Sequence, residues 1–250
     1  MLTQYDGTNY HGWQRQANTP KTIQEISEDA LCVRVGKFHT ITAAGRTDAG
    51  VHALAMPCVF SCEELNIPFL RLPLALNSLL PSDIRIVGAR QVSEAFDPIG
   101  AALSKTYRYS VDNSPIADVF SRKYAWHIPR SLDVSAMRQA AGHLVGTHDF
   151  KAFSAANGSA KTSVRTIFAI NVAKSQQTVH ITIRGNGFLY NMVRIISGTL
   201  VDVGLGRTPA DSVLEILQSR QRKKAGQTAP AFGLMMLSVD YGQALDVPKI

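Results

Sequence analysis

The sequence predicts an α+β protein made of two similar ferredoxin-like (βαββαβ) halves, joined in a mainly antiparallel sheet that carries its helices on one face. Three observations favour this fold. Segments with the apolar period of strands and of helices follow one another along the chain. The order strand, helix, strand, strand, helix, strand occurs twice, and such a unit builds an antiparallel sheet with helices on one face. A length of 250 residues suits one large or two ordinary domains.

The first half begins with a strand, a loop and a capped helix. The strand is predicted at residues 2–5 and the glycine-bearing loop at residues 6–16. Thr22 is followed three residues later by Glu25, the spacing of a capping box, which predicts a helix that begins after Thr22. The helix carries an apolar stripe with 3-4-3 spacing, formed by Ile23, Ile26, Ala30 and Val33.

Alternating apolar segments and helical stripes predict the remaining elements. In the first half they are strands 40–43, 53–61 and 84–89 and helix 69–79; in the second half they are strands 105–111, 164–172, 179–184 and 233–241, helices 134–145 and 189–203, and an extra helix after Pro209. The boundary lies near residues 97–104. We therefore predict an N-terminal domain of residues 1–100 and a C-terminal domain of residues 101–250, with the substrate between them. The alternative is that the repeated order is a coincidence.

Composition and charge narrow the classes of function. The net charge is +7 and the pI is about 9.5, which favours a polyanionic partner, with nucleic acid as the first candidate. Residues 1–7 lack the basic and apolar regions of a signal peptide. The most apolar helical stretch, residues 189–205, is interrupted by Arg194 and Asp202, which argues against a transmembrane span. We expect a soluble, cytoplasmic protein.

Cysteine and histidine spacing does not indicate a metal site. Cys58 and Cys62 have no matching second pair, and Cys32 stands alone. His143 and His148 are five residues apart and so lack the helical i, i+4 spacing of a two-histidine site. We therefore expect no bound metal.

The segment from Ala44 to Ala53 is the strongest candidate for chemistry. It places Asp48 between Gly45 and Gly50, and glycine lets a backbone turn tightly and approach a ligand closely. Arg46 lies two positions away and can keep the carboxylate ionised by charge pairing. The alternative is an ordinary turn, because Asp and Gly are both turn formers.

Two further residues suit a site that handles a nucleobase. Tyr107, Tyr109 and Val111 share one face of the strand at 105–111, where Tyr107 either stacks on a base or belongs to the core. Arg194 flanks an apolar helical stripe, so it needs a counter-charge from elsewhere in the fold, and Asp48 would serve. The stripe consists of Leu189, Met192, Val193, Ile196 and Leu200.

Two basic or aromatic segments allow two interpretations each. The cluster at residues 220–224 either contacts a polyanion or interacts with the C-terminal dipole of the preceding helix. In the first loop, Tyr10, His11 and Trp13 beside Arg15 either grip RNA or form a plain ordered loop.

Six segments together resemble the TruA-type tRNA pseudouridine synthases, in the order of that family and over nearly the whole chain. They are YDG and GWQRQ within residues 5–16, GRTDAGVHA at 45–53, KTYRY at 105–109, GTHDF at 146–150, FLYNMVR at 188–194 and APAFGL at 229–234. The resemblance implies the pseudouridine synthase fold. It also implies conversion of uridine to pseudouridine at positions 38, 39 and 40 of the tRNA anticodon stem-loop, by a homodimer without cofactor or metal.

The resemblance further implies roles for five residues. Asp48 would be the catalytic nucleophile and Tyr107 would stack on the target base. Arg194 would pair with Asp48, while Arg46 and Leu234 would shape the pocket. The reaction breaks the N1–C1′ bond and joins C5 to C1′. The carboxylate can attack C1′, act on the C2′ proton or add to uracil C6, and the sequence leaves these three open.

Two other functions use the same features. A non-catalytic RNA-binding protein of two RRM-like halves would use the charge and the tyrosines, but it gives Asp48 and Arg194 no role, and the match to the aromatic RNP strand signature is poor. A hydrolase that cleaves the glycosidic bond would use Asp48 and release free base. Hydrolysis leaves an abasic site, whereas isomerisation leaves the mass of the RNA unchanged.

Overall fold

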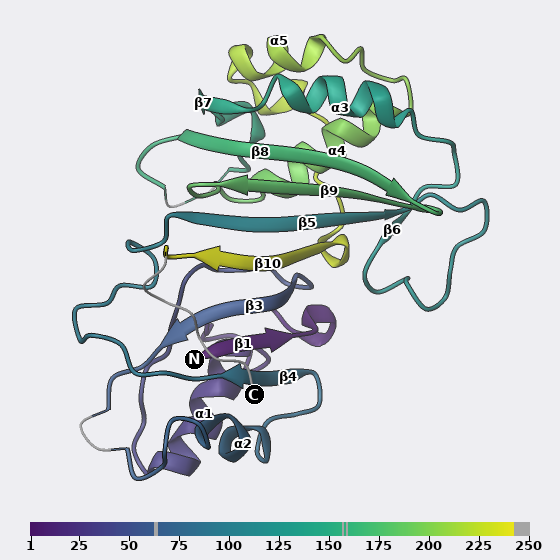
Figure 1. Cartoon of the computed structure of the whole chain (residues 1–250). Helices are drawn as coiled ribbons and strands as arrows, with labels where there is room; N and C mark the ends of the chain where they lie inside the picture. The colour runs from purple at the N-terminus through teal and green to yellow at the C-terminus, as the bar shows by residue number, and fades with distance from the viewer. Residues whose placement is uncertain (63–64, 157, 159, 243–250) are drawn as a thin grey trace. The chain divides into compact units, whose positions relative to one another are not determined.

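The computed structural model describes residues 1–62, 65–156, 158 and 160–242. Within it the chain forms two compact units (Figure 1). The first comprises Met1–Leu103 together with the chain from Met236, and the second comprises Ser104–Met235. The last strand therefore begins in the second unit and continues in the first.

The first unit is an antiparallel sheet with two of the predicted helices. Its elements are β1 (Leu2–Tyr5), α1 (Ile23–Val35), β2 (Thr42–Ala43), β3 (His52–Val59), α2 (Leu72–Asn77) and β4 (Ile84–Gly88), with the 3-10 turn η1 (Gly7–Asn9) after β1. β1 lies between β3 and β4, and β2 and the last strand, β10 (Leu234–Asp240), also pair with β3. Tyr5 lies opposite Ala53 on one side and Ile84 on the other.

Helix α1 begins where its sequence predicts, but its buried face matches the predicted stripe only in part. The Thr22 hydroxyl accepts a hydrogen bond from the Glu25 N–H at 3.3 Å, which confirms the cap. Of the predicted stripe, Ile23 and Ala30 are buried, whereas Val33 is 72% exposed and that part of the prediction is wrong. The buried face also includes three polar side chains, Gln24, Ser27 and Glu28. Buried polar groups are stable there because each one is hydrogen-bonded.

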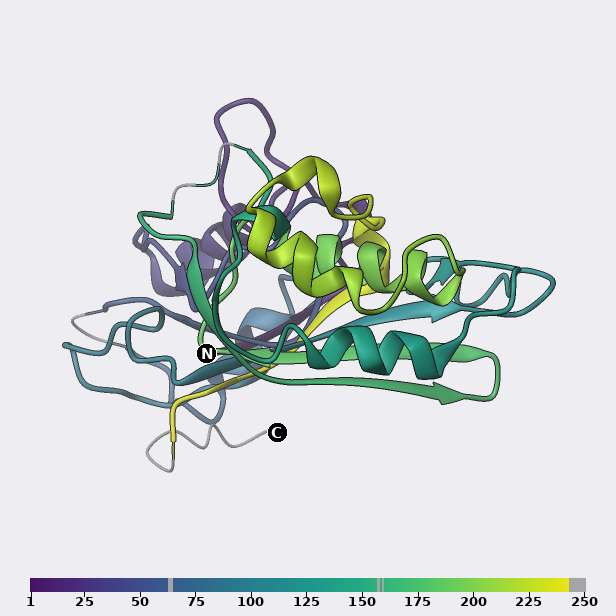
Figure 2. The same ribbon diagram turned by 90° about the horizontal axis from the view of Figure 1, so that it is seen from above.

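The second unit is also a mainly antiparallel sheet. Its elements are β5 (Ser104–Asp112), β6 (Trp126–His127), α3 (Val134–Gly142), β7 (Gly146–Asp149), η2 (Lys151–Phe153), β8 (Val164–Ser175), β9 (Thr178–Gly185), α4 (Met192–Gly204), α5 (Ser212–Ser219), η3 (Arg222–Lys224), η4 (Ala231–Gly233) and β10 (Leu234–Asp240). The sheet order is β5-β9-β8-β7 with antiparallel neighbours, and β6 pairs parallel to β5. In Figure 2 the helices of this unit lie on one side of its strands.

The second unit is not a plain repeat of the first, because β6 and β7 are additional. Two residues form β6, and β7 begins at Gly146 with a φ of 115°. Neither has the alternating apolar run that identifies a strand in a sequence. Each is defined by its partner strand, β5 or β8, so the predicted order lacked both.

The core of the second unit follows the predicted alternation along β5. Tyr107, Tyr109 and Val111 are buried, and β9 places Ile183 and Ile181 opposite the two tyrosines. Helix α4 buries the predicted stripe against this sheet. The α+β class with mainly antiparallel strands is thus confirmed. None of the helices formed by the described residues is both long enough and apolar enough to span a membrane.

Candidate active site

In the first unit, Asp48 lies in the loop that connects β2 to β3. Arg46 is exposed, Thr47 is buried and Asp48 is half-buried. The Val51 N–H donates to the Asp48 carbonyl at 3.1 Å, and Gly50, at φ 79°, closes this turn. The Asp-Ala-Gly segment is therefore a turn, as the simpler interpretation holds, and it leaves the Asp48 carboxylate half-buried.

Thr47, the residue before Asp48, is held in place by the first loop and by the end of β1. The Trp13 N–H donates to the Thr47 carbonyl at 3.0 Å, and the Tyr5 and Thr47 hydroxyls are 2.8 Å apart. Gly12, at φ 87°, lies so close that a Cβ there would be 2.6 Å from the Thr47 carbonyl oxygen. A side chain at residue 12 would therefore displace the loop.

The aromatic residues of the first loop are structural. Trp13 is 2% exposed and packs against Tyr5 with ring centroids 6.0 Å apart, and Tyr10 is 7% exposed. The Tyr10 hydroxyl donates to Asp83 at 2.5 Å, and burial together with this bond raises the pKa of Tyr10. These two buried rings support the second interpretation of this segment, an ordered loop.

The far end of the Asp48 loop is anchored at the start of β3. His52 is buried, and its Nδ1 accepts a hydrogen bond from the Gly7 N–H at 3.0 Å. A Cβ on Gly7 would overlap the Val51 carbonyl group. The first loop thus contacts the Asp48 loop on both sides of the aspartate.

In the second unit, Tyr107 faces an aromatic partner. Its ring is 8% exposed and meets Phe188 edge to face, with centroids 5.2 Å apart and an interplanar angle of 86°. Such a geometry fixes the plane of the ring. Phe188 belongs to the predicted FLYNMVR motif, but nothing in its spacing identifies it as the partner of Tyr107.

Tyr109, two residues along β5, anchors the turn before Leu234. Its hydroxyl donates to the Pro230 carbonyl at 2.8 Å, and Gly233 lies against its ring so closely that a Cβ there would be 2.6 Å from Cζ. Burial raises the pKa of Tyr109 against the opposing charge of Arg194. Leu234, which follows this turn, is buried.

Arg194 is held at two atoms of its guanidinium group. Its Nε donates to the Ala229 carbonyl at 2.8 Å and its Nη1 donates to the Asn191 Oδ1 at 2.8 Å. Asn191 precedes α4 in the left-handed conformation, at φ 58°. Segment 226–229 can cross α4 here because Gly198 has no side chain to meet Gln227. Asn191 is a site residue that the sequence did not single out.

The predicted site residues are divided between the units. The first unit contains Arg46 and Asp48, and the second contains Tyr107, Arg194 and Leu234. Within the second unit, Tyr109 is related to all three of its predicted site residues. It lies two residues from Tyr107 on β5, and its pKa is affected by the charge of Arg194. Its hydroxyl also anchors the turn before Leu234.

The basic cluster at residues 220–224 is partly structural. Arg220 pairs with Asp149 at 2.9 Å, and Arg222 donates to the Gly226 carbonyl and to the Thr228 hydroxyl. Lys223 and Lys224 are exposed. Across the part of the chain that the structure describes, no three His, Cys, Asp or Glu side chains are grouped so as to hold a metal ion.

Comparisons with known proteins point in one direction. A family model described as tRNA pseudouridine synthase matches residues 1–98 and 140–242. A tRNA pseudouridine synthase A of Thermoanaerobacter sp. (strain X514) is 44% identical over 96% of this chain and 98% of its own length. Its counterpart from Bacillus pumilus is 45% identical over 95% and 96%. A tRNA pseudouridine synthase A 2 of Clostridium tetani is 45% identical over 96% and 97%.

Proposed function

We propose that Asp48 is the catalytic nucleophile of this chain. The chain belongs to the tRNA pseudouridine synthase family and isomerises uridine to pseudouridine in tRNA. The chain is thus an isomerase. The observation that carries the role of Asp48 is its loop: a half-buried aspartate in a turn that buried residues of a separate segment fix on both sides. Such rigid support is what a group needs to attack one defined atom of a bound substrate.

The reaction requires that one bond breaks and another forms within the same nucleotide. The N1–C1′ bond is cleaved, the uracil turns and C5 joins C1′, while the proton on C5 leaves to solvent. A carboxylate is suited to a covalent intermediate of this kind, as in retaining glycoside hydrolysis. The target base has to leave its stack first.

We assign Tyr107 to the base and Arg194 to the charge of Asp48. The edge contact with Phe188 keeps the Tyr107 ring in one orientation, which suits stacking on a uracil. The anchoring of Arg194 by Ala229 and Asn191 suits a cation that holds a carboxylate in a single geometry. Arg46, which is exposed, and Leu234, which is buried, would help to shape the pocket, as the family resemblance implies.

The finer features of the function come from the family resemblance. We propose that the substrate is the anticodon stem-loop at positions 38, 39 and 40, that the enzyme is a cytoplasmic homodimer and that it requires neither metal nor cofactor. The net charge of +7 supports a tRNA substrate, because cationic surfaces attract the phosphate backbone.

Release of tritium from tRNA that carries C5-tritiated uridine tests the proposal. The wild-type chain should release tritium without added metal or nucleotide. Asp48→Asn, which keeps the shape and removes the charge, should abolish release while tRNA binding persists. Asp211→Asn is the matched control, because that side chain is 78% exposed and lies in the second unit. Full activity of Asp48→Asn would refute the assignment.

Three other results have distinct meanings. Tyr107→Phe should retain partial activity if the ring stacks, whereas complete loss assigns a proton transfer to the hydroxyl. Binding of tRNA by the wild type without tritium release would favour a non-catalytic RNA-binding protein. An abasic site in the product would favour a hydrolase.

A further inference from the structure

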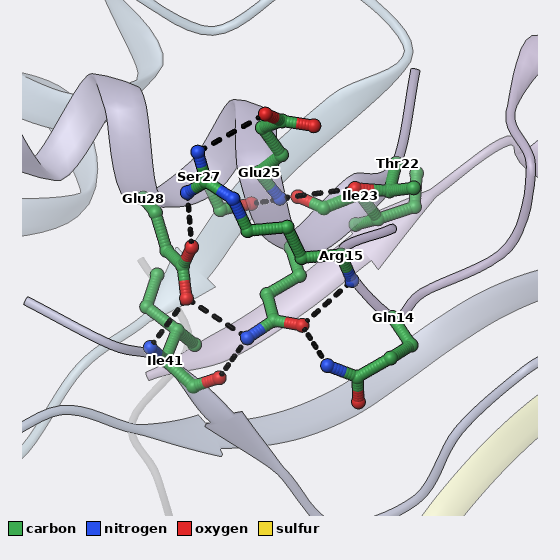
Figure 3. Close-up of polar contacts among 9 residues, drawn as sticks. Gln14, Arg15, Thr22, Ile23, Glu25, Ser27, Glu28 and Ile41 are labelled. Atoms are coloured by element: carbon green, nitrogen blue, oxygen red, sulfur yellow. Dashed lines mark hydrogen bonds and ion pairs between the residues drawn. The ribbon is translucent and has the colours of Figure 1, made fainter. Parts of the chain in front are cut away.

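We infer that Glu28, a buried carboxylate on α1, is a positioning residue for the Asp48 loop and acts together with Gln24 and Arg15. The inference rests on the proposed role of Asp48. All of the residues involved belong to the first unit, and Figure 3 shows how their side chains converge between α1, the first loop and Ile41.

Two side chains of α1 hold both peptide groups of Ile41, the residue directly before β2. Glu28 Oε1 accepts from the Ile41 N–H at 3.0 Å, and Gln24 Nε2 donates to the Ile41 carbonyl at 3.1 Å. Gln24 Nε2 also donates to Glu28 Oε1 at 2.8 Å. The backbone that enters β2, and then the Asp48 loop, is therefore fixed by helix side chains.

Gln24 also holds residues 14 and 15 of the first loop. Gln24 Oε1 accepts from the Arg15 N–H at 2.9 Å and from Gln14 Nε2 at 2.7 Å. The next residue toward the N-terminus, Trp13, donates its N–H to the Thr47 carbonyl. Helix α1 thus sets the position of two backbone segments that reach the aspartate from different directions.

The two oxygens of Glu28 have separate partners. Glu28 is 1% exposed, and an ionised carboxylate at such a site needs compensation. Its Oε2 accepts from Arg15 Nη1 at 2.9 Å, while Arg15 Nη2 pairs with Glu25 at 3.1 Å. Oε1 faces Ile41 and Gln24. The charge is therefore balanced at one oxygen, and the loop is positioned by the other.

This division of labour separates positioning from stability. Glu28→Ala removes both oxygens. Glu28→Gln keeps an oxygen for the Ile41 N–H but turns an amide nitrogen toward Arg15. We expect both variants to unfold at a lower urea concentration than the wild type. Only Glu28→Ala should form pseudouridine more slowly.

The test is the single-turnover rate of pseudouridine formation at saturating tRNA, measured where circular dichroism shows each variant folded. Glu28→Ala should be slower by about 10- to 100-fold, because a shift of ~1 Å at the reacting group has effects of this size. Its Kd for tRNA should be unchanged, and Glu28→Gln should retain most of the rate. The matched control is Asn77→Ala, whose side chain holds the N–H and carbonyl of Ile86 on β4 at 2.8 and 2.9 Å.

Equal rates for Glu28→Ala and Asn77→Ala would overturn the inference and leave Glu28 a purely stabilising residue. Should Glu28→Ala not fold, Gln24→Met takes its place, because it keeps the volume and removes the donor to the Ile41 carbonyl; the same fall in rate is expected. Failure of the proposed function looks different. In that case the wild type forms no pseudouridine, or Asp48→Asn remains active.

Discussion

Substitution of Gly12 by alanine should displace the Asp48 loop, because the added methyl group would meet its backbone. A Cβ at residue 12 would lie 2.6 Å from the Thr47 carbonyl oxygen and 3.0 Å from the Asp48 carbonyl carbon. Ordinary contact begins at 3.4 Å, so Thr47 has to move by about 0.8 Å, the difference between the two distances. Displacement of this size next to Asp48, the proposed nucleophile, should lower the rate by up to ~100-fold.

The stability change has two parts. A positive φ costs an alanine roughly 1–2 kcal/mol, and the φ of Gly12 is 87°. Overpacking against the loop adds roughly 1–3 kcal/mol. We therefore expect Gly12→Ala to lower the free energy of unfolding by roughly 2–5 kcal/mol.

Gly36→Ala separates the two parts. Gly36 ends α1 at φ 80°, and a Cβ there would meet nothing within 4 Å. It should show the conformational cost alone, with an unchanged rate. Urea unfolding and single-turnover assays of both variants provide the test. Equal losses of stability, with full activity in Gly12→Ala, would refute the close-approach argument.

Two further predictions concern the second unit. Asn191→Gly relieves the positive φ but removes the acceptor for Arg194, so the rate should fall while the midpoint of urea unfolding does not; an unchanged rate would contradict the anchoring role. Burial and the charge of Arg108 lower the pKa of His180, so the folded state binds fewer protons than the unfolded state. The free energy of unfolding should therefore decrease as the pH falls through about 6.5, the ordinary pKa of histidine. His180→Gln should reduce this dependence in urea unfolding at a series of pH values, and an unaltered slope would contradict it.

Much of the fold could be predicted because its signals are local. The alternation along β5 and the Thr22 cap of α1 depend on neighbours within a few residues. The buried face of α1 depends instead on distant partners. Glu28 is buried because Ile41 and Arg15 supply its hydrogen bonds, and no pattern within the helix records this. The same applies to β6, which exists only through its pairing with β5.

The candidate site shows the same division. The polar, glycine-rich segment around Asp48 indicates a candidate reactive group from residue types alone. Residue types do not determine which side chains are exposed. The sequence therefore allows Trp13 to be interpreted as an RNA contact, although its side chain is buried. Asn191 could not be identified either, since its role depends on a left-handed backbone and on the reach of Arg194.

The precision of the Asp48 loop therefore comes from outside its motif. Gly7 does not have a positive φ, yet a Cβ there would overlap Val51, so its small size serves a close approach rather than a turn. Gly12 combines both demands. Residues 45–53 contain the proposed nucleophile, whereas the first loop and α1 determine where its loop lies. Gly7→Ala, Gly12→Ala and Glu28→Ala should consequently lower the rate of the chemical step without a change in tRNA affinity, because the loop that they displace carries the proposed nucleophile.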